Sequence, residues 1–216
     1  MFKREEVKAI GFDLDGTLYA PSEEINDRVR TQIARKILEK SPFLETIDRA
    51  RQYFESRYQE IQSGSKVLSE VGYKDPSIII DECLAKADVL DLIKEDRRLA
   101  KFLAQLRENN FVYLLTHTPR ELGVKKLQRL GIIPELFDRQ IYSDTINTDR
   151  LEGKPFQYAI DESGIPPKNH VYIGDRKQSD IIPANRLGMQ TIAVWSKIPE
   201  ATLSLPTIHD IEGVFA

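Results

Sequence analysis

Two aspartates, Asp13 and Asp15, stand two positions apart at the end of the apolar run VKAIGF, and Gly16 and Thr17 follow them directly. Carboxylates this close repel each other unless a positive charge lies between them. A divalent cation supplies that charge, because a metal ion shared by two carboxylates makes their proximity favourable. The pair therefore indicates metal-dependent chemistry, although aspartates at a strand end also serve as turn or helix-cap residues.

Polar residues also end two later apolar runs. The run NFVYLL leads into Thr116, and HVYIG leads into Asp175, with Asp180 five positions further on. Ligands of open parallel sheets bind beyond the carboxyl ends of the strands, where these residues would meet Asp13. Mg²⁺ prefers oxygen ligands and is usually held by one or two carboxylates together with a substrate phosphate. We expect Asp13 and Asp175 to supply carboxylates, with Asp180 at the site or behind it.

A hydroxyl and a cation complete the set that phosphoryl transfer requires, because this reaction depends on stabilising charge on the transferring group. Thr116 offers the hydroxyl and Lys154, in EGKP, the ammonium, and Pro155 predicts a helix that begins at this lysine. Each residue alone has a plainer explanation: a helix cap for Thr116, Asp175 or Asp180, and a surface position for Lys154. Their joint occurrence, in order and in the expected strand context, favours a phosphoryl-transfer site.

The segments that must position these residues alternate between strands and helices. Short apolar runs predict buried strands at 7–12, 111–115, 170–173 and 191–194, with a weaker one at 139–142. Helical patterns lie between the later runs; one of them consists of Leu122, Lys126, Leu127 and Leu130. This alternation is typical of a doubly wound, Rossmann-like α/β core with a parallel sheet covered on both faces.

Residues 21–96 contain no convincing strand. Apolar residues recur there at helical spacing, and Pro21-Ser22, Ser41-Pro42 and Asp75-Pro76 supply the breaks. We therefore expect an inserted all-α domain of three or four helices at 21–96. The α/β core would then be discontinuous, with residues 1–20 and 97–216.

Composition limits the partners and the location of the protein. The chain has 216 residues, 41% hydrophobic and 30% charged, as in a soluble globular protein. With a net charge of -3 and no sustained basic face, neither a nucleic acid nor a membrane is expected as a partner. Cys83, the single cysteine, excludes an intrachain disulfide, and no apolar run approaches the roughly 20 residues that span a bilayer. We expect a cytoplasmic protein whose oligomeric state stays open.

The ordered motifs resemble those of the haloacid dehalogenase superfamily, and specifically of its phosphatases. DLDGTL resembles the first motif of the family, Thr116 in LLTHT the second, Lys154 in GKP the third and GDRKQSD the fourth. The resemblance extends over nearly the whole chain. It implies a Mg²⁺-dependent phosphatase that hydrolyses a small phosphorylated metabolite.

The resemblance also implies a role for each matching residue. Asp13 would attack phosphorus to give an aspartyl-phosphate, and Asp15 would protonate the leaving oxygen and then activate water. Mg²⁺ would bind the side chains of Asp13 and Asp175 and the backbone carbonyl of Asp15. Thr116 and Lys154 would hold the phosphoryl group. The supporting residues would be Gly16, Thr17 and Asp180.

Some positions refine the assignment. An aspartate at position 15 favours phosphate chemistry, because the dehalogenases of the superfamily release a halide without protonating it. Thr17 would fix the aim of Asp15. His117 stands where many relatives have Asn and is a further candidate for phosphate binding. Arg176 would pair with Asp180 or reach the substrate.

The inserted helices resemble the cap of the family, which closes over the site and selects the substrate. DLDGTLYAP, ESRYQEIQSG and YSDTINTDRLEGKP are similar to the pyrimidine 5'-nucleotidase branch, which implies a nucleoside 5'-monophosphate as substrate. Tyr19 and the cap aromatics Tyr53, Phe54 and Tyr58 would be packing residues or substrate contacts. The alternatives are a phosphoglycolate or sugar-phosphate phosphatase, a phosphomutase on the same core, and a non-catalytic phosphate-binding protein.

Overall fold

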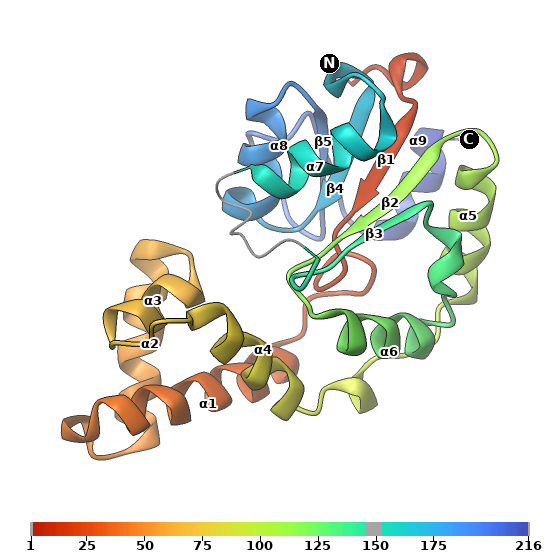
Figure 1. Cartoon of the computed structure of the whole chain (residues 1–216). Helices are drawn as coiled ribbons and strands as arrows, with labels where there is room; N and C mark the ends of the chain where they lie inside the picture. Colours follow the sequence, from red (N-terminus) through yellow and green to blue (C-terminus); the bar gives the residue numbers. More distant parts are fainter. Residues whose placement is uncertain (1, 146–152, 216) are drawn as a thin grey trace. The chain divides into compact units, whose positions relative to one another are not determined.

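The computed structural model describes residues 2–145 and 153–215 and divides the chain into two compact units (Figure 1). The first unit comprises Met1–Pro21 and Ile93–Ala216, and the second comprises Ser22–Leu92. The second unit is therefore an insertion in the sequence of the first. No helix among the described residues is long and apolar enough to cross a membrane.

The first unit is built on a parallel sheet. Its described strands are β1 (Ala9–Phe12), β2 (Phe111–Leu115), β3 (Arg139–Ile141), β4 (His170–Gly174), β5 (Gln190–Val194) and β6 (Leu203–Leu205), in the order β3-β2-β1-β4-β5-β6. Every neighbouring pair is parallel. In the centre, Phe12 is in register with Leu114 of β2 and Ile173 of β4. The residues that follow these three strands consequently leave the sheet at one edge.

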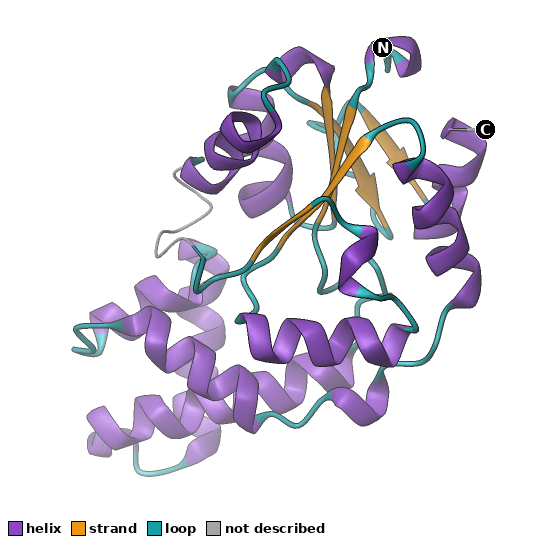
Figure 2. Ribbon diagram, turned by 45° about the vertical axis from the view of Figure 1, so that its right-hand side comes forward, coloured by secondary structure: helices purple, strands orange, loops and turns teal. Residues whose placement is uncertain are grey.

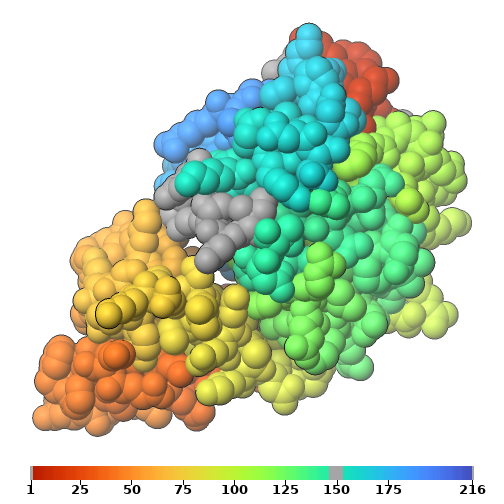
Figure 3. All heavy atoms as spheres, viewed as in Figure 1, coloured from red at the N-terminus to blue at the C-terminus, as the bar shows by residue number. Residues whose placement is uncertain are grey.

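Helices cover both sides of this sheet (Figure 2), which confirms the predicted α/β class. They are α5 (Arg97–Arg107), α6 (Arg120–Leu130), α7 (Lys154–Ser163), α8 (Ile182–Arg186) and α9 (Glu212–Phe215). At the edge where the strands begin, the start of the chain lies beside the segments that lead into β2 and β4 (Figure 3). There the Lys8 N–H donates to the Asn169 carbonyl (2.8 Å), and the Phe111 N–H donates to the Lys8 carbonyl (2.9 Å).

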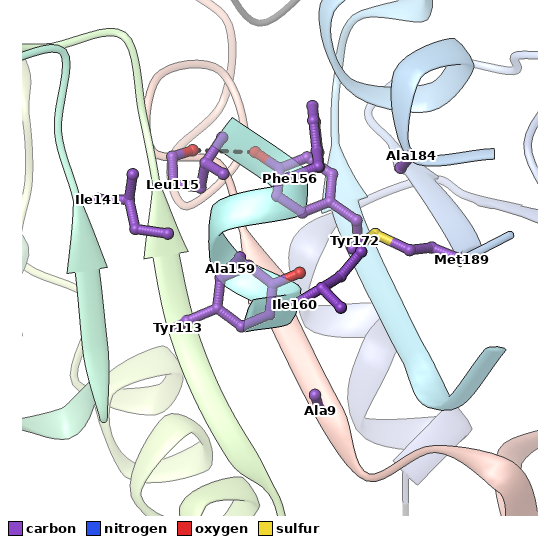
Figure 4. Packing of buried hydrophobic residues seen from close by; sticks show 10 residues of the cluster. All are labelled: Ala9, Tyr113, Leu115, Ile141, Phe156, Ala159, Ile160, Tyr172, Ala184 and Met189. Atoms are coloured by element: carbon purple, nitrogen blue, oxygen red, sulfur yellow. Dashed lines mark hydrogen bonds between the residues drawn. The ribbon is translucent and has the colours of Figure 1, made fainter. Parts of the chain in front are cut away.

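Aromatic packing fixes α7 against the sheet (Figure 4). The ring of Phe156 meets that of Tyr172 edge-on at a centroid distance of 4.8 Å, and the Tyr172 hydroxyl donates to the Leu115 carbonyl (2.9 Å). Such edge-to-face pairs are favourable beyond the area that they bury. Because Phe156 is in the first turn of α7, this contact sets where that helix begins.

The inserted unit has a hydrophobic core of its own. Its helices are α1 (Glu23–Lys40), α2 (Ile47–Ile61), α3 (Gly64–Glu70) and α4 (Pro76–Lys86). The side chains of Ser22, Thr46 and Ser63 accept backbone hydrogen bonds at the N-termini of α1, α2 and α3. The aromatic residues of α2 belong to this core, since Phe54 is buried in it and Tyr53 and Tyr58 pack against it. Cys83 is buried there too, as expected of a small apolar residue.

Strand β6 was not predicted. It is three residues long, half-buried, and lies at the edge of the sheet in a tail that contains prolines. A strand this short carries too few alternations of burial to be recognised from its sequence.

A buried histidine opens β4. The Nε2 atom of His170 lies 3.1 Å from the Ile165 carbonyl oxygen, and Nδ1 lies 3.5 Å from the Tyr113 hydroxyl. Burial lowers the pKa of His170 to about 4, and the hydrogen bond to Ile165 opposes burial only in part. The imidazole is therefore neutral in the folded chain over the whole range above this pKa.

This pKa predicts an acid-dependent loss of stability. An unfolded histidine titrates near 6.5, so between pH 6.5 and 4 the unfolded chain binds a proton that the folded chain does not, and stability falls as the pH falls. Relative to His170→Gln, which does not titrate, the wild type should lose about 2–3 kcal/mol of unfolding free energy between pH 7 and pH 4.5. Urea unfolding at both pH values measures this difference. An equal gap between the two proteins at both pH values would contradict the prediction.

Candidate active site

Three aspartates meet at the carboxyl edge of the sheet. Asp13 follows β1, Asp175 follows β4, and Asp180 lies in the π-helical turn Lys177–Ile181. One carboxylate oxygen of each lies within 4.8 Å of the other two. Asp13 and Asp180 are buried, and the Asp175 side chain is 14% exposed. This set fits a hard divalent cation such as Mg²⁺, which takes oxygen ligands and offsets the repulsion between carboxylates.

Asp180 organises the loop that presents Asp175. Its Oδ2 atom accepts the backbone N–H groups of Asp175 (3.1 Å) and Arg176 (2.8 Å), and its Oδ1 accepts the Ser179 hydroxyl (3.1 Å). Gly174 is required for this approach, because a Cβ atom there would lie 2.5 Å from the Asp180 carboxylate. Asp180 therefore holds this loop through hydrogen bonds to the backbone, and its support of a metal site stays a prediction.

The turn after Asp13 is shaped by Gly16 and Thr17. Gly16 has φ +75°, in the left-handed region, and a Cβ atom at this position would lie 2.6 Å from Oδ2 of Asp175. The Thr17 hydroxyl lies 3.5 Å from both Oδ2 of Asp13 and Oδ1 of Asp175. We expected Thr17 to orient Asp15, and the structure instead directs its hydroxyl toward the three-aspartate cluster.

Trp195, directly after β5, also holds this turn. Its indole N–H donates to the Thr17 carbonyl (3.1 Å), and its backbone has φ +65°. A left-handed conformation costs a bulky residue on the order of 1–3 kcal/mol and persists only where the surroundings impose it. No pattern in the sequence distinguished this tryptophan.

Asp15 faces a different set of partners. Its Oδ1 accepts hydrogen bonds from the Tyr19 hydroxyl and the Lys126 ammonium, and its Oδ2 accepts one from the Thr118 hydroxyl (2.5 Å). Burial by itself would raise the pKa of Asp15. The charge of Lys126, together with these hydrogen bonds, outweighs burial and lowers the pKa to about 2. Asp15 is therefore ionised at neutral pH.

The sequence did not identify Lys126 or Thr118 as site residues. Lys126, on α6, is only 1% exposed, and the helical pattern counted it among apolar positions. A charged residue on an apolar helix face was the available signal, since lysine is rarely buried unless it is paired. Tyr19 was expected to be a packing or substrate residue. Burial and the adjacent carboxylate raise its pKa, so the hydroxyl keeps the proton that it donates.

The remaining candidates lie on loops around the cluster. Thr116 is buried directly after β2, where its hydroxyl accepts the Thr118 N–H (3.1 Å). His117 follows in the same loop and is half-buried, and Lys154 is exposed at the first residue of α7. Nε of Arg176 lies 3.9 Å from Oδ2 of Asp175. Phosphate binding by Thr116, His117 and Lys154 stays a prediction. Residues 146–152 of the stretch YSDTINTDRLEGKP lie outside the described residues.

Comparison with known proteins gives consistent matches. Residues 7–188 match the family model of the haloacid dehalogenase-like hydrolases. Glyceraldehyde 3-phosphate phosphatase of Methanopyrus kandleri is 32% identical over 202 residues, which cover 87% of this chain and 84% of that protein. Pyrimidine 5'-nucleotidase YjjG of Escherichia coli is 26% identical over 117 residues, or 51% of this chain and 52% of that protein. A crystal structure of a HAD phosphatase from Thermococcus onnurineus shares the fold, with a TM-score of 0.67, 20% identity and coverage of 97% and 98%.

Replacing Gly16 tests whether the turn and the cluster depend on each other. Gly16→Ala places an alanine in the left-handed conformation and makes it clash with Asp175. Gly188→Ala also places an alanine in the left-handed conformation, at φ +85°, but the space around it is open. Gly188→Ala should lose about 1 kcal/mol of stability, and Gly16→Ala should lose more because of the clash. Thermal unfolding with and without Mg²⁺ should show stabilisation by the cation in the wild type and in Gly188→Ala, and a loss of it in Gly16→Ala. Equal stabilisation in all three proteins would contradict the prediction.

Proposed function

The chain belongs to the haloacid dehalogenase-like hydrolases and is a phosphatase of that family, and we propose that it hydrolyses a small phosphomonoester by way of an aspartyl-phosphate on Asp13. The observation that carries this proposal is the three-aspartate cluster, whose member Asp13 is buried directly after the central strand β1. A carboxylate at this place can reach a phosphoryl group that approaches the carboxyl edge of the sheet.

The reaction has two steps. In the first, a carboxylate oxygen of Asp13 bonds to phosphorus, the bond from phosphorus to the leaving oxygen breaks, and Asp15 gives its proton to that oxygen. In the second, water attacks phosphorus, Asp15 takes a proton from the water, and the bond between phosphorus and Asp13 breaks. One water is consumed, one alcohol and one phosphate are released, and Asp15 is protonated again.

Asp15 needs a proton at the start of this cycle, although its pKa is about 2. A bound phosphate brings negative charge beside the carboxylate, which raises the carboxyl pKa and opposes the effect of Lys126. Asp15 then takes up a proton from solvent as the substrate binds.

The other residues of the site bind and orient. The side chains of Asp13 and Asp175 and the backbone carbonyl of Asp15 would hold Mg²⁺, and Asp180 supports their loop. When bound, the cation supplies positive charge for the transferring phosphoryl group. Thr116, His117 and Lys154 are the candidates for contacts to the phosphate oxygens. We assign the role of the cap, which selects the substrate, to the inserted unit Ser22–Leu92 because it interrupts the sequence of the first unit where the cap of the family does.

A sugar phosphate is the substrate class that we propose in place of the nucleoside monophosphate suggested by the sequence. The relative named glyceraldehyde 3-phosphate phosphatase matches along 87% of this chain, whereas the nucleotidase matches along 51%. Because a cap determines substrate choice, a relative aligned along nearly the whole chain is the better guide.

Asp13→Asn tests the nucleophile. The amide cannot form the aspartyl-phosphate, so kcat/KM for p-nitrophenyl phosphate with Mg²⁺ should fall by roughly 10³-fold or more. Asp161→Asn, on an exposed part of α7, is the matched control and should keep wild-type activity. EDTA should abolish the activity of the wild type, and added Mg²⁺ should restore it. Full activity in Asp13→Asn would rule out the proposed intermediate.

A substrate comparison tests the substrate class. Released phosphate should give a kcat/KM for glyceraldehyde 3-phosphate at least about tenfold above that for UMP, with phosphoglycolate as a third compound. A preference for UMP would support the nucleotidase alternative. Interconversion of sugar phosphates without release of phosphate would instead indicate a phosphomutase.

A further inference from the structure

Lys126 is a charged group in the interior of the first unit. Its side chain is 2% exposed, and its ammonium contacts the Asp15 carboxylate and lies 3.4 Å from the Thr118 hydroxyl. Removing an ammonium group from water is costly, and pairing it with a carboxylate often does no better than break even against apolar packing. An apolar residue at this position of α6 would be the simpler way to fill the core. The burial of Lys126 therefore points to a task at Asp15.

The geometry around Asp15 defines that task. Lys126 and Tyr19 bind Oδ1, while Thr118 binds Oδ2, so both oxygens are held at once. Thr118 is itself anchored, because its N–H donates to the hydroxyl of Thr116 (3.1 Å). A carboxylate tied at both oxygens has one orientation, which is what proton transfer to a defined atom requires.

On the basis of the function proposed above, we propose that Lys126 is a positioning residue that, with Thr118, holds the Asp15 carboxylate in the orientation for proton transfer to the leaving oxygen. The nearest alternative is a purely structural ion pair. The two differ in one respect: a positioning role affects only the steps in which Asp15 moves a proton. A structural role affects the whole site.

Leaving groups separate these possibilities. Nitrophenolate is a weak base that departs with little help from an acid, whereas the alkoxide of a sugar phosphate needs the proton from Asp15. The ratio of kcat/KM for glyceraldehyde 3-phosphate to that for p-nitrophenyl phosphate therefore reports on proton donation. kcat/KM is the appropriate quantity because it covers the reaction only as far as the first transfer, before the shared hydrolysis of the intermediate.

The test uses Lys126→Met, which keeps the apolar stem and removes the charge. The kcat/KM for glyceraldehyde 3-phosphate should fall by roughly 10²-fold or more, and that for p-nitrophenyl phosphate by less than tenfold. Lys126→Gln, whose amide can still donate to Asp15, should recover part of the ratio. Thr118→Val, which removes the other donor at almost constant volume, should shift the ratio in the same direction. Lys125→Met, at the exposed neighbouring lysine of α6, is the matched control and should leave both values unchanged.

An equal fall for both substrates, or no fall, in folded Lys126→Met would overturn the positioning role. If Lys126→Met does not fold, the Gln and Val variants decide in the same way. A wild type that is inactive on both compounds counts against the proposed function. In that case a crystal structure of Lys126→Met tests the positioning role of Lys126. An Asp15 carboxylate that keeps its bonds to Thr118 and Tyr19 without Lys126 would overturn the inference, and a reoriented one would support it.

Discussion

Repulsion among four aspartates at one edge of the sheet is the constraint around which the first unit is organised. Asp13 and Asp15 follow β1, and Asp175 and Asp180 follow its neighbour β4. The negative charges of these carboxylates are offset in different ways. Lys126 of α6 contacts Asp15, and backbone N–H groups donate to Asp180. For Asp13 and Asp175 the proposed balance is a divalent cation. Asp13 and Asp15, two positions apart, therefore lie in different electrostatic surroundings, as the different roles proposed for them require.

The location of this site follows from strand register, and the short distances between its carboxylates follow from two glycines. β1 and β4 are adjacent and parallel, so Asp13 and Asp175 leave the sheet together. Gly16 and Gly174 then allow carboxylates to come closer than a Cβ atom would permit. Register is set by burial of the strands on both faces, which is a property of the whole core. The distances between the carboxylates depend on the two glycine positions.

The central part of both the fold and the site was predictable from the sequence because it depends on local patterns. Buried parallel strands are continuous apolar runs, and polar residues that end them stand out. Lys126 and Trp195 were not predictable in this way, since their roles arise from contacts with Asp15 and Thr17, far away in the chain. Periodicity places a residue on a helix face without showing what that face meets. Strand β6 was missed because pairing with β5, rather than its own short sequence, makes it a strand.

The insertion of the helical unit between β1 and β2 also has a consequence for the order in which the protein folds. Ala9 pairs with Phe111 and His170, so the central strand has to wait for partners that are made much later. Ser22–Leu92 has a core formed from contacts within that segment. Local contacts form quickly, and closure of long loops is slow. During synthesis the helices can therefore assemble first, while the strand that leads into Asp13 stays unpaired until the second half of the chain emerges.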